Sequence, residues 1–94
     1  MSEVNPSELE AEINYLRTTP VTDIIANQLF VLFQIAAMYL GESPARLADA
    51  QLVIDVASSM ITTGSTRLGE HGELYKTALA ELQQAYVRAS AASN

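Results

Sequence analysis

The stretch PVTDIIANQLFVLFQIAAMYLG, residues 20–41, decides the fold of this chain. It contains no charged residue between Asp23 and Glu42, and it lacks the strict apolar–polar alternation that is typical of a half-buried strand. Pro20 suits the start of a helix and Gly41 suits its end, so the stretch predicts one helix about 30 Å long. Because apolar side chains surround most of this helix, protein must cover it on more than one side.

A narrow polar strip interrupts the apolar surface of this long helix. At about 100° per residue, Asp23, Asn27 and Gln34 fall on one face, together with Val31 and Met38. Two interpretations of Asn27 and Gln34 remain open: the strip faces water, or the two amides form a buried hydrogen-bonded pair across a helix interface. An unpaired buried amide costs about 1–3 kcal/mol, so a buried pair would fix the register of that interface. The candidate interface residues are Asn27, Phe30, Val31, Gln34 and Met38.

A short amphipathic helix is predicted before the long one. Ser7 and Glu10 form a capping-box pattern at its start, and its apolar stripe consists of Leu9, Ile13 and Leu16. A helix of this length is marginal by itself, so it needs a partner surface, either on its own chain or on a neighbour.

Two further amphipathic helices complete the predicted bundle. Ser43 and Pro44 predict the start of the third helix, and a loop rich in Thr, Ser and Gly within residues 62–72 separates it from a final helix that starts at about residue 73. The apolar stripe of the third helix contains Leu47, Ala50, Ile54, Ala57 and Ile61, and Val53, Val56 and Met60 broaden it. We therefore expect an all-α fold: a tail and short helix at 1–19, a bundle of three main helices at 20–88, and a disordered tail at 89–94.

The composition excludes several classes of protein. Ninety-four residues suit one small domain, and the absence of cysteine excludes disulfides and thiolate zinc sites. The net charge of −6 argues against direct nucleic-acid binding, whereas it permits a partner with a basic surface, such as a ribosomal protein. The first twelve residues are acidic and polar, unlike a secretory signal, so we expect a cytoplasmic location.

Groups that could support catalysis are few. His71 is the only histidine, and residues 70–73 could offer metal ligands, but the neighbouring glycines favour an exposed, mobile loop. Asp49 and Asp55 lie six residues apart on the third helix, so they do not form an acid–base pair. The sequence contains no glycine-rich phosphate loop and no Glu-x-x-His repeat. We therefore predict no catalytic, cofactor-binding or metal site, and no enzymatic activity.

Several apolar positions follow an order that is found in a known family. They are Leu40-Gly41-Glu42, then Leu47, Ala50 and Ile54-Asp55, then Leu74, Leu79, Leu82 and Tyr86-Val87. Over residues 21–87 this order resembles the bacterial family called domain of unknown function 1844. The chain departs from that family at residues 62–66, where a neutral turn replaces a basic one. The resemblance implies a helical fold and a bacterial source, but no activity and no catalytic residue.

Two functions from different classes follow from the long apolar helix. A self-associating interaction or adaptor module is favoured, because a second copy would complete the burial of that helix in a homodimer. The alternative is a protein attached to a membrane through residues 24–41, whose length approaches the roughly 20 residues of a spanning helix. Asn27, Gln28 and Gln34 within this segment, and the lack of flanking basic clusters and tryptophans, make the membrane the weaker hypothesis.

Overall fold

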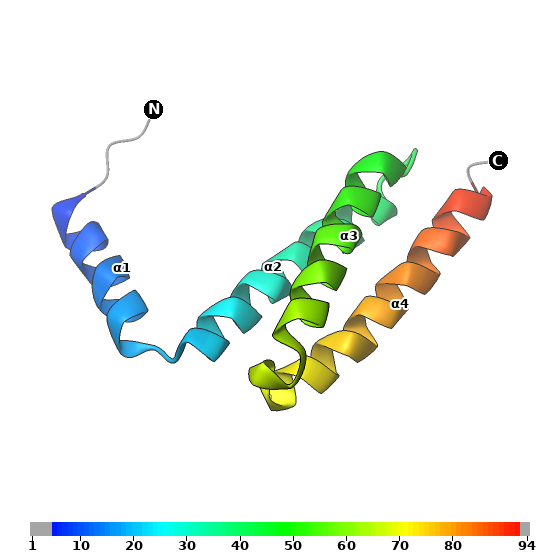
Figure 1. The fold of residues 1–94 in the computed structure, drawn as a ribbon. Helices are drawn as coiled ribbons and strands as arrows, with labels where there is room; N and C mark the ends of the chain where they lie inside the picture. The colour runs from blue at the N-terminus through cyan, green and yellow to red at the C-terminus, as the bar shows by residue number, and fades with distance from the viewer. Residues whose placement is uncertain (1–4, 93–94) are drawn as a thin grey trace.

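The computed structural model describes residues 5–92, which contain four α-helices, one short 3₁₀-helix and no strand (Figure 1). The elements are α1 (Pro6–Thr18), α2 (Val21–Gly41), α3 (Leu47–Gly64), the 3₁₀-helix η1 (Ser65–Leu68) and α4 (Glu70–Ala92). The predicted all-α architecture is confirmed, with three main helices and a shorter N-terminal one.

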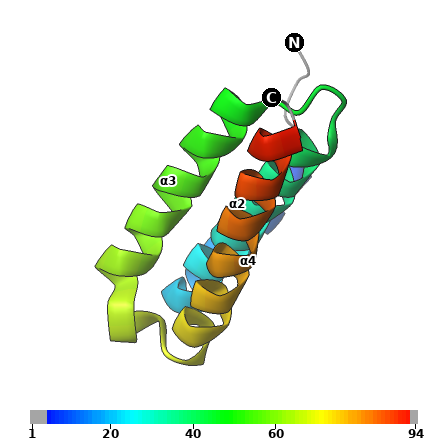
Figure 2. The same ribbon diagram turned by 90° about the vertical axis from the view of Figure 1, so that its right-hand side faces the viewer.

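Helices α2, α3 and α4 pack side by side as a three-helix bundle (Figure 2). The central cluster contains Leu29 and Phe33 from α2, Ala57 and Ile61 from α3, and Leu68 from η1. Small residues on α2 and α3 are fully buried between these two helices, which therefore approach closely: Ala26, Ala36, Ala50 and Ala57. Helix α4 covers this cluster with partly buried side chains, and its one fully buried residue is Gly72.

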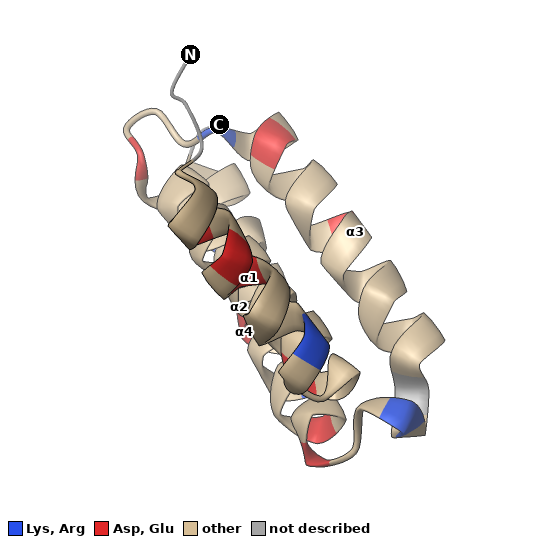
Figure 3. Cartoon of the chain, turned by 90° about the vertical axis from the view of Figure 1, so that its left-hand side faces the viewer, with Lys and Arg blue, Asp and Glu red and all other residues tan. Residues whose placement is uncertain are grey.

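Helix α1 diverges from the bundle and forms a V with α2 (Figure 1). None of its residues is buried, and the linker between it and α2 consists of Thr19 and Pro20. The Nδ2 atom of Asn27 donates a hydrogen bond of 2.8 Å to the hydroxyl oxygen of Tyr15, which ties α1 to the bundle. Acidic residues lie along the N-terminal part of α1, and Arg17 lies in its last turn (Figure 3).

Helix α1 begins earlier than the capping-box pattern indicates. Asn5 is the N-cap, because its Oδ1 accepts hydrogen bonds from both the backbone nitrogen and the hydroxyl of Ser7, at 2.9 and 2.7 Å. Pro6 then occupies the first helical position, where its fixed φ angle is favourable and its missing N–H costs nothing. The assignment of Ser7 as the cap was wrong, because the side chain of Asn5 caps the helix two residues earlier and leaves Ser7 inside the first turn.

Helix α3 begins at Leu47 rather than at Pro44. The backbone amide of Arg46 donates to the carbonyl of Tyr39, and the carbonyl of Arg46 accepts the first helical bond from Ala50. The Arg46 guanidinium lies 4.1 Å from the centre of the Tyr39 ring and donates to Asp49, an interaction that raises the pKa of Arg46. Arg46 therefore occupies the position before the helix that was predicted for Ser43.

Helix α4 is longer at both ends than the sequence predicts. It begins at Glu70, so His71 lies in its first turn and not in a mobile loop. It also continues through Ala92, which overturns the predicted disordered tail for residues 89–92; Ser93 and Asn94 lie outside the described residues. Alanine has the highest helix propensity, and Ala89 and Ala92 lie beside the loop at 42–45, which explains the extension.

Two glycines shape the connection between α3 and α4. Gly69 has a φ angle of +62°, which glycine adopts without the steric cost that other residues carry. Gly64 lies against Leu68, because a Cβ atom on Gly64 would be only 2.7 Å from the Cδ1 atom of that leucine. The chain can therefore turn tightly here while Leu68 stays in the core.

Candidate interaction surface

One long face of α2 is not covered by the rest of the described chain. All five of the predicted interface residues lie on it and all five are exposed: Asn27, Phe30, Val31, Gln34 and Met38. We call these five residues the outer face of α2. Phe30 is 53% exposed and Met38 is 54% exposed, which is unusual for large apolar side chains in the middle of a central helix.

The two amides on the outer face have different surroundings. Asn27 bonds to Tyr15 of α1, as described above, whereas Gln34 lies at a shallow groove between α2 and α4, beside Phe33 and Leu82. Both amides are exposed, so no buried amide pair forms within one chain. The outer face therefore presents apolar side chains around a polar strip.

The apolar stripe of α1 is a second exposed surface. Leu9, Ile13 and Leu16 are each between 43% and 49% exposed. Tyr15, which bonds to α2, lies about 100° around the helix from Leu16, so the stripe is directed away from the contact with Asn27. Helix α1 is thus amphipathic, but no other part of the described chain covers its apolar side.

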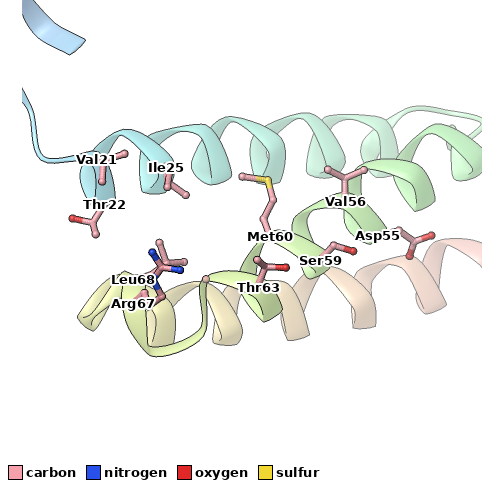
Figure 4. Close-up of a pocket in the computed structure, with 11 residues that line it drawn as sticks. Val21, Thr22, Ile25, Asp55, Val56, Ser59, Met60, Thr63, Arg67 and Leu68 are labelled. Carbon is pink, nitrogen blue, oxygen red and sulfur yellow. The ribbon is translucent and has the colours of Figure 1, made fainter. Parts of the chain in front are cut away.

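A groove of about 670 Å³ runs between α2, α3 and η1 (Figure 4). We call it the α2–α3 groove. Its apolar wall consists mainly of Val21, Ile25, Val56, Met60 and Leu68. Arg67 lies at the end near Val21, and Asp55 lies at the opposite end (Figure 4).

This groove was not predicted from the sequence, because apolar periodicity placed Val56 and Met60 in the buried stripe of α3. Val56 is 44% exposed, and Leu52, one turn earlier, is also exposed. A pair of large apolar residues four positions apart on the flank of a helix is the signal that could have indicated a second apolar surface.

The charged side chains of the described residues form small sets of contacts: Arg46 with Glu42 and Asp49, Lys76 with Glu73, and His71 with Asp23. The Nε2 atom of His71 lies 3.0 Å from the Oδ1 atom of Asp23, and both side chains are partly exposed. Within residues 5–92 no group of three His, Asp or Glu side chains could hold a metal ion. The His71–Asp23 contact joins the start of α4 to the start of α2.

The fold and these surfaces define a small all-α bundle with exposed apolar faces on its central helix and on a separate N-terminal helix. Comparison with known proteins adds no relative: no family model, no curated protein and no solved structure matches the chain. The resemblance to the domain of unknown function 1844 family stays a prediction.

Proposed function

We propose that this protein is a helical interaction module, without enzymatic activity, that associates with a second copy of itself through the outer face of α2. The exposure of Phe30, Val31 and Met38 on a central helix is the observation that carries this proposal. Apolar side chains that lie together on an exposed helix face are typical of a protein contact, and an isologous pair would bury the same face on both copies.

The exposed area of the single chain supports this proposal. The chain exposes 6692 Å², whereas a compact monomer of 10.2 kDa exposes about 5,300 Å². The excess of about 1,400 Å² is larger than the roughly 800 Å² that one partner contributes to a standard interface. A second copy could therefore bury enough surface for a stable dimer.

Sedimentation velocity at micromolar concentration tests the self-association. We expect the wild-type protein to sediment as a dimer, and the Phe30→Glu variant to sediment as a monomer with an unchanged far-UV circular dichroism spectrum, because a buried unpaired carboxylate is costly. The Gln83→Glu variant is the matched control, since it adds the same charge to an exposed position on α4. A wild-type protein that stays monomeric at this concentration would refute the proposal.

The acidic charge extends the proposal to a second partner. With a net charge of −6 on each chain, the dimer would attract a protein with a basic surface in the cytoplasm, and this contact would weaken as salt screens it. Recovery of the same basic partner at low and high salt would argue against an electrostatic contact.

Membrane attachment is the second candidate, and α2 is the observation that favours it. Its 21 residues have a mean hydropathy of 1.7 over the best window, of which 22% is buried, and it is the one helix within residues 5–92 that is long and apolar enough to cross a membrane. A core helix of a bundle passes the same test. Untagged protein that stays in the membrane pellet after salt and alkali washing would favour the membrane over the dimer.

A further inference from the structure

We infer that α1 of one copy occupies the α2–α3 groove of a second copy, running parallel to the α2 helix that it covers. This inference rests on the proposed self-association and adds to it a donor helix, an acceptor groove and an orientation. The occupant is a second copy because the surface that fits the groove is present on this same chain, as the following observations indicate.

The apolar stripe of α1 has the size and character that the groove accepts. Helix α1 has 13 residues and is about 20 Å long, whereas the α3 wall from Asp55 to Thr63 extends about 12 Å and η1 lengthens it. Leu9, Ile13 and Leu16 would meet the wall that Val21, Val56 and Met60 provide. Exchange of a terminal helix between copies is a known route to dimers, because it reuses contacts within one sequence.

The charges at the two ends of the groove define the orientation. Arg67, at the Val21 end, makes no ion pair or side-chain hydrogen bond with any residue of the described chain, and Asp55, at the other end, bonds only to Gln51. Helix α1 is acidic over its first two turns, through Glu8, Glu10 and Glu12, and has Arg17 in its last turn. Opposite charges meet at both ends only when α1 runs parallel to α2.

A chain's own α1 cannot take this orientation. Two residues connect Arg17 and Thr18 to Val21, so a helix folded back on its own groove would run antiparallel to α2. Arg17 would then lie beside Arg67, and the glutamates would lie toward Asp55, so like charges would meet at both ends. The partner's α1 has no such restriction. In an antiparallel pair of α2 helices the partner's α1 ends near the C-terminal half of α2, where the partner's α2 begins, so it can run parallel to the α2 that it covers.

Engineered cysteine pairs test the inference directly, because the chain has no cysteine of its own. The Leu16→Cys and Val56→Cys variants are prepared separately, mixed, and oxidised. In the inferred orientation these two positions lie at the same end of the groove, so we expect a disulfide-linked heterodimer. The Leu9→Cys variant, mixed with the Val56→Cys variant, is the orientation control and should yield little linked product. The Asn14→Cys variant, on the opposite side of α1, controls for random collisions.

The outcomes separate the inference from the proposed function. Efficient linkage in the Leu16→Cys and Val56→Cys mixture supports the inference. A disulfide within one chain of the doubly substituted Leu9→Cys/Val56→Cys protein would overturn it, because α1 would then cover its own groove. The absence of any linkage, in a protein that still sediments as a dimer, would overturn the inference and leave the α2 interface standing. A monomer would refute both.

A charge reversal provides a second readout. The Arg67→Glu variant should dissociate about tenfold more readily than wild type, and the doubly substituted Glu10→Arg/Arg67→Glu protein should recover most of that loss. Circular dichroism verifies that both variants keep their helices. A dissociation constant that is the same in wild type and in the Arg67→Glu variant would overturn the orientation.

Discussion

Gly64 lies so close to Leu68 that the core has no room for a side chain at this position. A Cβ atom at this position would lie 2.7 Å from Cδ1 and 2.8 Å from Cγ of Leu68, a side chain that is 4% exposed and cannot move into solvent. We expect Gly64→Ala to lower the free energy of unfolding, because the overpacking penalty of about 1–3 kcal/mol exceeds the roughly 1 kcal/mol that alanine gains in a helix. Urea denaturation followed by circular dichroism measures this difference.

Gly41→Ala is the matched control for that substitution. No atom lies within 4 Å of a Cβ atom at Gly41, and this glycine ends α2 without a positive φ angle. Its free energy of unfolding should equal that of wild type or exceed it by up to about 1 kcal/mol, because alanine reduces the entropy of the unfolded chain. A Gly64→Ala protein as stable as the Gly41→Ala protein would contradict the tight contact with Leu68.

Among the elements, α4 is held by apolar packing, which includes the contact between the rings of Phe33 and Tyr75, rather than by charge. The ring centres of Phe33 and Tyr75 lie 5.3 Å apart. The contact between His71 and Asp23, by contrast, joins two side chains that are 35% and 47% exposed. A double-mutant cycle with Asp23→Ala and His71→Ala should give a coupling free energy below about 1 kcal/mol, because solvent screens exposed pairs. Phe33→Ala should cost about 3–5 kcal/mol, because it leaves a cavity in the core.

Urea denaturation of these variants shows whether the Phe33–Tyr75 contact or the Asp23–His71 contact contributes more to the free energy of unfolding. A coupling free energy of more than about 2 kcal/mol between Asp23 and His71 would mean that their contact, and not the aromatic pair, holds the start of α4. If Phe33→Ala unfolds the protein, Phe33→Leu is a milder truncation. Its loss in free energy of unfolding should still exceed the coupling free energy between Asp23 and His71.

Most of the elements could be predicted from sequence, because apolar periodicity reports which face of a helix is buried. The exposure of the outer face of α2 was one of two interpretations of Asn27 and Gln34, and the sequence left both open, because an amide can face water or pair across an interface. The start of α4 could not be predicted, because glycines usually interrupt helices, whereas the burial of Gly72 here allows close packing. The α2–α3 groove depends on the path of η1 and on the divergence of α1, and neither follows from local periodicity.

At the scale of the whole molecule, the chain is more extended than its length requires. Its radius of gyration is 16.0 Å, against about 12 Å for a compact domain of 94 residues. We expect small-angle scattering from the monomeric Phe30→Glu variant to give a radius close to the larger value, because α1 buries no residue against the bundle. A radius near 12 Å would contradict the divergent position of α1.

The two-residue linker between α1 and α2 has a consequence for stoichiometry. Each chain both donates a helix and accepts one. If two copies exchange helices with each other, the assembly closes at two copies. If each copy donates to the next, one donor helix and one acceptor groove stay vacant at the ends, and copies can add without limit. Proline at position 20 restricts the directions in which the donor can leave its own bundle. Lengthening this linker with flexible residues should therefore let α1 turn and occupy the groove of its own chain, which would end the exchange of helices between copies.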